Sequence, residues 1–371
     1  MRILFVFLFG FQPIFSFAGY PFKLSGTVPA YLNGQTLELV ISDSYSENKY
    51  SIKKRMVIQN GRFFFTGEIN KPCEDASLFI RNTNCLFQFV LDSGINLIRF
   101  LPPQVNSKLY KNKFSNAVVN QTKSAKVKKA IDSTVNFYYQ SYGKPSKEYK
   151  HIIVLDVNKK EQLFDSELNI LQQYSDSYYS LIHLYKASLQ LSVDISKLFK
   201  VYENFDIELK NSNLGVELFD NLLKTKSIQI GQRIPVIEIK DTTEVSITNR
   251  VMYGRIYLLA FGATWCKPCI DNFKHLKELY AKYNNYGFEI LYVSIDSNIV
   301  KWKNLIKNND LRWLNTYEGY TWSQSKIVKQ FNLRAIPFYL LVNKEGYIVY
   351  NIFEVKDFDL LQLEMYIKSA L

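Results

Sequence analysis

The chain has 371 residues, a formal net charge of +12 and four cysteines, and 47% of its residues are hydrophobic and 15% aromatic. That length predicts about two or three packed units rather than a single domain. Four cysteines are too few for a fold held together by disulfides, and the apolar content is large enough to build cores without them.

Residues 1–18 are predicted to be a signal peptide. A basic second residue precedes an apolar stretch over residues 3–15, and Ser16-Phe17-Ala18 is a small-x-small cleavage site. A membrane anchor is the alternative reading, but Gln12 and Pro13 interrupt a run already shorter than the roughly 20 residues of a spanning helix. We therefore expect a soluble protein exported to the periplasm or cell envelope, where disulfides persist.

Residues 19–105 are predicted to form an antiparallel β domain, either a small sandwich or a barrel. Short runs rich in β-branched and aromatic residues alternate there with turn signals. Asn60-Gly61 predicts a two-residue hairpin, because both positions tolerate positive φ. Asp92-Ser93-Gly94 marks a second turn, and Pro102-Pro103 is expected to close the domain.

Cys73 and Cys85 lie within this β domain and are not expected to form a disulfide. A hairpin that pairs residues 76–80 with 86–91 separates the two cysteines by about 20 Å, at about 3.3 Å per residue. A disulfide requires Cα atoms within roughly 7 Å. We expect both cysteines to be buried as small hydrophobic residues.

Residues 106–226 are predicted to be a helical region, because apolar residues recur there with a period near 3.6. Gly143-Lys144-Pro145-Ser146 and Ser212-Asn213-Leu214-Gly215 are expected to be turns. This region carries no recognisable chemistry, and its aromatic residues are interpreted as packing surface.

A basic surface is predicted where the lysines have few acidic neighbours. It would suit an acidic protein or an anionic membrane surface, although a solvated helix face is the simpler interpretation. An exported protein without a recognition motif is not expected to bind nucleic acid. The lysines are Lys108, Lys111, Lys113, Lys123, Lys126, Lys128, Lys129, Lys144, Lys147 and Lys150.

Strands and helices alternate over residues 227–371, which predicts a three-layer α/β unit. The expected strands are 236–240, 256–262, 288–295, 338–342 and 347–352, and the expected helices are 267–286, 300–308, 323–331 and 357–370.

Cys266 and Cys269 lie where the strand at 256–262 gives way to the long helix, the position at which redox dithiols work. A thiol in the first turn of a helix is close to unsatisfied N–H groups, which stabilise its thiolate, and Lys267 would add to that effect. Two intervening residues let the second sulfur reach a mixed disulfide at the first. Cys266 is therefore the predicted nucleophile and Cys269 the resolving thiol.

Three alternatives for this cysteine pair are a structural disulfide, half of a zinc site and a peroxide-reducing thiol. Zinc needs two further ligands, and His151, His183 and His275 show no paired spacing. The peroxide-reducing class ranks lower because Thr264 is the only part of its upstream signature present. Dithiol exchange is the favoured interpretation.

Ile336-Pro337 opens the late strand at 338–342, and we expect its peptide bond to be cis. In that state the free backbone groups of the loop can pair with an extended substrate beside the dithiol. A strand-edge proline is the structural alternative.

The motif Trp265-Cys266-Lys267-Pro268-Cys269, together with Ile336-Pro337-Phe338, resembles the thioredoxin superfamily. Within it, the chain is similar to the exported thiol–disulfide reductases of cytochrome c maturation. Gly231-Gln232-Arg233-Ile234-Pro235 resembles their entry segment, and Tyr292-Val293-Ser294-Ile295-Asp296 their second core strand. The resemblance covers residues 227–371, and the segment before them resembles the amino-terminal β domain of unknown function that often precedes such modules.

The resemblance implies a dithiol oxidoreductase that reduces protein disulfides and is regenerated by a membrane electron donor. It implies no cofactor other than the redox-active disulfide and no metal. Reduction is favoured over oxidation on the resemblance alone, since thiolate stabilisation by Lys267 would favour oxidation or isomerisation. The oligomeric state is not predicted. The residues implied to bind substrate or shape the site are Trp265, Lys267, Pro268 and Pro337.

Three positions depart from the family's pattern. Asn272 and Lys274 stand where the reductase branch carries an acid and a proline, and Ala260 stands where cytoplasmic thioredoxins carry a buried aspartate. A buried acid helps to move the proton of the resolving thiol, so its absence predicts slower attack by Cys269. It also leaves open a second function, an envelope partner-binding protein with a non-catalytic thioredoxin-like scaffold.

Overall fold

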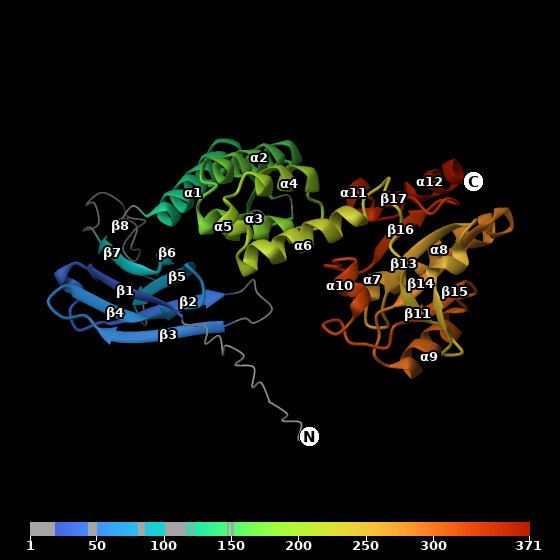
Figure 1. Ribbon diagram of the computed structural model, residues 1–371, viewed down its shortest axis with the longest axis horizontal. Helices are drawn as coiled ribbons and strands as arrows, with labels where there is room; N and C mark the ends of the chain where they lie inside the picture. Colours follow the sequence, from blue (N-terminus) through green and yellow to red (C-terminus); the bar gives the residue numbers. More distant parts are fainter. Residues whose placement is uncertain are drawn as a thin grey trace, which may run out of the picture. The chain divides into compact units, whose positions relative to one another are not determined.

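The computed structural model describes residues 19–43, 50–80, 86–100, 117–119, 122–146, 148–149 and 152–371 (Figure 1). The predicted signal peptide, Cys85, Pro102-Pro103, His151 and five of the ten lysines of the basic surface lie outside these residues. Among the described helices, none has the length and apolarity that a bilayer crossing requires.

The chain divides into two compact units. One consists of Met1–Ile170 with Ser177–Ser180, and the other of Leu171–Asp176 with Leu181–Leu371. The helices of the predicted middle region are therefore shared between the two units. Each unit is described by itself.

The first unit contains two four-stranded sheets, with strand orders β4-β1-β7-β8 and β3-β2-β5-β6. Their inward side chains, among them Leu39, Phe63 and Leu78, form one core. The strands are β1 (Tyr20–Thr27), β2 (Thr36–Asp43), β3 (Tyr50–Val57), β4 (Arg62–Ile69), β5 (Cys73–Ile80), β6 (Leu86–Asp92), β7 (Gly94–Phe100) and β8 (Ala117–Val119), with a 3-10 turn at Ala30–Leu32.

The pairing of these strands confirms the antiparallel β domain and corrects two details. The predicted two-residue turn is confirmed: Asn60 and Gly61 have positive φ, and Gln59 and Arg62 bridge across it. The expected strand pairing does not continue beyond that bridge. The reason is that β4 pairs along its whole length with β1, which places β3 and β4 in different sheets. In addition, β1 runs parallel to β7.

The register of β5 and β6 agrees with the predicted hairpin around residues 81–85. Phe79 lies opposite Leu86, and Cys73 lies opposite Asp92 at the far end of the ladder. Cys73 is buried, as expected.

The helices that follow confirm the predicted helical region. Helix α1 ends at Tyr142, which confirms the break at 143–146. The second predicted turn lies earlier than expected: α5 ends at Lys210, and Ser212 caps α6 by accepting a hydrogen bond from the Gly215 N–H, so residues 213–215 are already helical. The elements are α1 (Lys123–Tyr142), β9 (Lys144–Pro145), β10 (Ile153–Val154), α2 (Val157–Gln173), α3 (Tyr178–Ser188), α4 (Ile195–Glu203), α5 (Ile207–Lys210) and α6 (Asn213–Ser227).

A seven-stranded mixed sheet forms the centre of the carboxy-terminal domain, with the order β12-β11-β15-β14-β13-β16-β17. All seven residues of β13 are buried. The strands are β11 (Glu238–Lys240), β12 (Ser246–Thr248), β13 (Ile256–Gly262), β14 (Phe288–Ser294), β15 (Leu314–Tyr317), β16 (Phe338–Val342) and β17 (Ile348–Asn351).

Helices cover both faces of this sheet, as predicted for a three-layer unit (Figure 1). Helix α8 packs on one face through Phe273 against Tyr292, and Phe331 and Phe353 pack on the other. The predicted helix at 267–286 is interrupted at Asn272. The elements are α7 (Lys267–Asp271), α8 (Phe273–Tyr283), α9 (Ile299–Asn309), α10 (Lys326–Gln330), α11 (Ile352–Val355) and α12 (Leu363–Ala370), with 3-10 turns at Asn249–Met252 and Asn284–Tyr286.

Candidate active site

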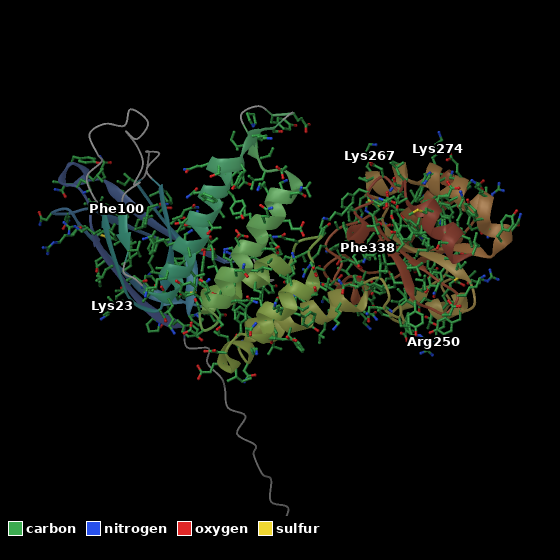
Figure 2. All side chains as sticks on the ribbon, turned by 90° about the horizontal axis from the view of Figure 1, so that it is seen from above. Lys23, Phe100, Arg250, Lys267, Lys274 and Phe338 are labelled. Atoms are coloured by element: carbon green, nitrogen blue, oxygen red, sulfur yellow. A yellow bond between two sulfur atoms is a disulfide. The ribbon has the colours of Figure 1, made fainter. Side chains whose placement is uncertain are left out.

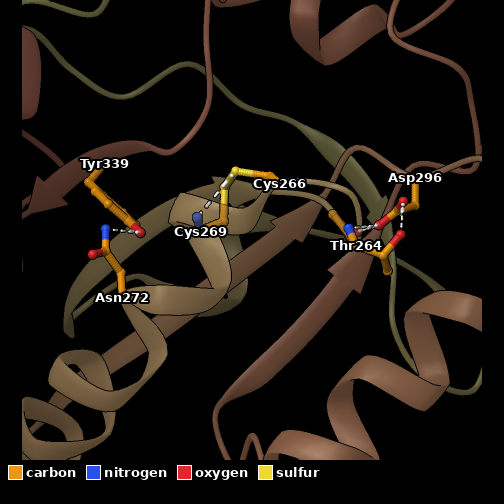
Figure 3. The surroundings of a disulfide bond; sticks show 7 residues. Thr264, Cys266, Cys269, Asn272, Asp296 and Tyr339 are labelled. Atoms are coloured by element: carbon orange, nitrogen blue, oxygen red, sulfur yellow. Dashed lines mark hydrogen bonds between the residues drawn. A yellow bond between two sulfur atoms is a disulfide. The ribbon is translucent and has the colours of Figure 1, made fainter.

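Cys266 and Cys269 form a disulfide at the carboxyl end of β13, with their Cα atoms 5.3 Å apart (Figure 3). Cys266 is the N-cap residue of α7, and its Sγ accepts a hydrogen bond from the Cys269 N–H at 3.2 Å. The same N–H would stabilise a Cys266 thiolate after reduction. Since α7 ends at Asp271, this local donor, rather than the dipole of a long helix, is the main backbone contribution.

Trp265 precedes the first cysteine and Pro268 lies between the two, and both side chains are exposed. Trp265 is 62% exposed, whereas Cys266 and Cys269 are 5% and 1% exposed. Pro268 lies in the first turn of α7, where a missing N–H removes no helical hydrogen bond. The motif therefore presents an aromatic ring beside a nearly covered disulfide.

Lys267 is paired with Asp271, a contact that the sequence interpretation did not anticipate. Its Nζ lies 2.7 Å from a carboxylate oxygen of Asp271, and the two side chains are 83% and 58% exposed. Figure 2 shows Lys267 and Lys274 on the outer surface of the domain. Because a nearby carboxylate cancels most of the field of the ammonium, Lys267 adds little to the stabilisation of a Cys266 thiolate.

Asp296 anchors the loop that leads into Cys266. Its buried carboxylate accepts hydrogen bonds from the Thr264 N–H at 2.8 Å and the Thr264 hydroxyl at 2.7 Å, and from the Ser294 hydroxyl. The loop after β13 is thus tied to the end of β14 (Figure 3). Sequence reasoning did not assign a site role to Asp296, although an acid directly after an apolar strand was a usable signal.

Two tyrosines lie beside Ala260, the residue that stands where cytoplasmic thioredoxins carry a buried aspartate. Ala260 is opposite Tyr292 on one neighbouring strand and Tyr339 on the other, so all three side chains share one face of the sheet. On the Cys269 side of the disulfide, the Asn272 amide donates to the Tyr339 hydroxyl at 3.3 Å (Figure 3). Burial raises the pKa of Tyr339 to about 12, so its hydroxyl stays protonated at neutral pH. This side of the site offers hydroxyl donors instead of a carboxylate.

The Ile336–Pro337 peptide bond is cis, as predicted. Strand β16, which begins directly after it, pairs with β13 through Phe261 and Phe338. Ile336 packs against Cys266 and Cys269. The structure therefore brings together the cysteine motif and the Ile336-Pro337 segment, which are about 70 residues apart in the sequence.

Potential metal ligands are scattered over the part of the chain that the structure describes. No group of three or more potential ligands among histidine, cysteine, aspartate and glutamate comes together there. The Nδ1 atom of His275 lies 3.9 Å from a carboxylate oxygen of Glu278.

Comparison with known proteins places this domain among thioredoxin-like proteins. Residues 254–348 match a family model described as thioredoxin-like. A thiol–disulfide oxidoreductase, ResA, from Bacillus cereus is 29% identical over 137 residues, which cover 37% of this chain and 77% of that protein. ResA from Bacillus subtilis is 23% identical over 137 residues, covering 37% of this chain and 74% of that protein.

Two solved structures from Bacteroides species also match part of this chain. A thiol–disulfide oxidoreductase from Bacteroides fragilis is 23% identical, with a TM-score of 0.31, and the match covers 35% of this chain and 99% of that one. A thiol:disulfide interchange protein from Bacteroides sp. is 24% identical, with a TM-score of 0.33, and the match covers 38% of this chain and 89% of that one.

Proposed function

We propose that this chain, whose carboxy-terminal domain is thioredoxin-like, is an exported thiol–disulfide oxidoreductase that reduces protein disulfides through Cys266 and Cys269. One observation carries the proposal. The two sulfurs are bonded to each other at the start of a helix, and a backbone N–H points at Cys266 Sγ. The curated relatives named above support the general activity.

The proposed reaction proceeds in two exchanges that conserve electrons. The Cys266 thiolate attacks one sulfur of the substrate disulfide, forms a mixed disulfide, and displaces the other substrate sulfur, which takes up a proton. Cys269 then loses its proton, attacks Cys266 Sγ and releases the second substrate thiol. Two electrons have moved from the protein to the substrate, and Cys266 and Cys269 are again joined.

Regeneration requires a dithiol donor, which we propose to be a membrane protein. The donor reduces the Cys266–Cys269 disulfide by the same chemistry in reverse. The amino-terminal pattern of residues 1–18 supports an exported location, in the periplasm or cell envelope, for both partners.

The Lys267–Asp271 pair supports reduction as the direction. An unpaired cation beside Cys266 would stabilise the thiolate, and so the reduced form, which makes a dithiol a better oxidant. Because the Asp271 carboxylate offsets the charge of Lys267, the lysine stabilises the reduced form little and does not favour oxidation as the direction.

An insulin assay distinguishes the directions. With dithiothreitol as donor, we expect catalytic amounts of the reduced chain to accelerate the precipitation of insulin as its interchain disulfides are broken. A variant with both Cys266 and Cys269 replaced by serine is the matched control and should give the uncatalysed rate. If the chain is inert with insulin but oxidises a reduced, unfolded protein, the proposed direction is wrong. If it does neither, the partner-binding alternative stands.

A further inference from the structure

A pocket of about 730 Å³ opens beside the dithiol loop. It is formed by the loop before Cys266, the loop that follows β14, one side of α9 and the loop that follows β15. Pro337 directly precedes β16, which lies on the opposite side of β13 from β14. The pocket is therefore distinct from the surface that the Pro337 loop offers to a substrate.

Two tryptophans form its aromatic wall. Trp265 and Trp322 meet edge to face with ring centroids 6.3 Å apart, and both line the pocket. Trp265 directly precedes the proposed nucleophile, so this wall begins one residue before the reacting cysteine. Trp265 is exposed and Trp322 is half-buried. Tryptophan is among the residues most enriched at the hot spots of protein–protein interfaces.

Apart from Ile295 and Leu305, the remaining lining is polar, and it includes one lysine without an ion pair. Asn304 and Asn308 offer amide donors and acceptors from α9, and Lys301 lies on the same side of that helix. Among the described residues Lys301 makes no ion pair, whereas Lys303, on the same helix, is paired with Glu244. The one carboxylate in the lining, Asp296, is 4% exposed and accepts hydrogen bonds from Thr264 and Ser294, whereas Lys301 is exposed. The exposed charge that this lining offers to a ligand is therefore that of the Lys301 ammonium.

We propose that this pocket binds the segment of a substrate polypeptide next to the cysteine attacked by Cys266, and selects segments with an acidic side chain that pairs with Lys301. The inference rests on the proposed exchange at Cys266 and adds a substrate preference to it. The two tryptophans would pack against the peptide, the amides of Asn304 and Asn308 would form hydrogen bonds with its backbone, and Lys301 would form an ion pair with its acidic side chain.

Single-turnover kinetics with synthetic substrates test the preference. The probes are pairs of disulfide-linked peptides. The two members of a pair differ only in having an aspartate or a lysine at one position beside the cysteine, and each flanking position has its own pair. The pre-reduced full chain is mixed with each peptide, and the second-order rate constant of its oxidation is measured. We expect the best aspartate peptide to react about tenfold faster than its lysine counterpart, as one interfacial charge pair allows.

Variants assign this preference to the pocket. Lys301→Glu should abolish or reverse it, and Trp322→Ala should slow both peptides by about tenfold. Lys307→Glu is the matched control, because it makes the same charge change on α9 outside the pocket lining, and it should leave the preference intact. The rate of oxidation by a small aliphatic, uncharged disulfide reagent is measured for each variant, and the peptide rates are divided by it, so that a change in the intrinsic reactivity of Cys266 is not mistaken for a change in peptide binding.

The outcomes separate the subsite from the chemistry. If the wild-type chain reacts with the reagent but shows equal rates for both peptides, or if Lys301→Glu and Lys307→Glu change the preference equally, the subsite does not exist as proposed. If the wild-type chain fails to react even with the small reagent, the proposed exchange at Cys266 is itself wrong, and the subsite falls with it.

Discussion

A Cys269→Ser variant of the full chain accumulates mixed disulfides between Cys266 and its substrates, and a Cys266→Ser variant accumulates none. The reason is that Cys269, whose Cα lies 5.3 Å from that of Cys266, is the thiol placed to resolve the mixed disulfide, so its loss leaves the first exchange intact and blocks the second. Turnover falls in both variants on the order of a thousandfold or more, the scale seen when a catalytic nucleophile is lost.

The trapped species are measured on non-reducing gels and assigned to Cys266 by peptide mass spectrometry. The variant lacking both cysteines is the control for adducts formed elsewhere, including at Cys73. Trapping by Cys266→Ser, with none by Cys269→Ser, would reverse the two assigned roles. Absence of adducts from both variants would leave the dithiol as a structural disulfide.

A Gly262→Ala variant is expected to lose about 2 to 3 kcal/mol of unfolding free energy in the carboxy-terminal domain. A Cβ at residue 262 would lie 2.0 Å from the Tyr292 hydroxyl oxygen and 2.8 Å from its Cζ. Tyr292 is fully buried between Phe273 and the strands, so its ring has no room to move away. The domain must therefore distort at the end of β13, directly before the dithiol loop.

Thermal unfolding followed by tryptophan fluorescence measures this loss, because all four tryptophans lie between residues 265 and 322. The midpoint should fall by about 5 to 10 °C. Tyr292→Phe is the compensating change: it removes the clashing oxygen, which has no hydrogen-bond partner among the described residues, and should by itself cost little or nothing. The double variant should recover part of the stability, because the closest contact is removed while the 2.8 Å contact with the ring carbon Cζ remains. Equal losses in the single and double variants would contradict the steric explanation.

The dithiol and its immediate supports could be predicted from the sequence because their signals are local. An apolar strand, a Cys-x-x-Cys motif at a helix start and an isoleucine-proline pair before a second apolar strand are each recognisable within a few residues. The strands at 256–262 and 338–342 agree with β13 and β16 to the residue. The Lys267–Asp271 pair was also within reach, since a separation of four residues places two side chains on one face of a helix.

The parts that were missed depend on pairing between distant segments. Strand β15 is four residues long and includes Asn315 and Thr316, whose polar side chains are buried only because Thr316 bonds to the Tyr292 carbonyl and Asn315 to nearby carbonyls. No periodicity reveals such a strand. The closeness of Asn272 to Tyr339 likewise follows from the β13–β16 register, which the sequence does not state.

The first unit shows the same limit in its turns. Asn60-Gly61 correctly predicted positive φ at both positions, since that is a property of the two residues themselves. Which strands pair is decided instead by burial: β4 directs Phe63 and Phe65 into the core and lies against β1. A turn signal therefore predicted the reversal of the chain without predicting the sheet to which the next strand belongs.

The reduction potential of the Cys266–Cys269 pair tests the central claim most directly. The full chain is equilibrated in graded thiol–disulfide buffers, and alkylation of Cys266 and Cys269 is read by mass spectrometry at each ratio. We expect a single two-electron transition near the value of thioredoxin, about −270 mV. A pair that stays joined across every buffer would contradict the claim that it is a working dithiol, and a value near −120 mV, that of a strong periplasmic oxidant, would contradict its role as a reductase.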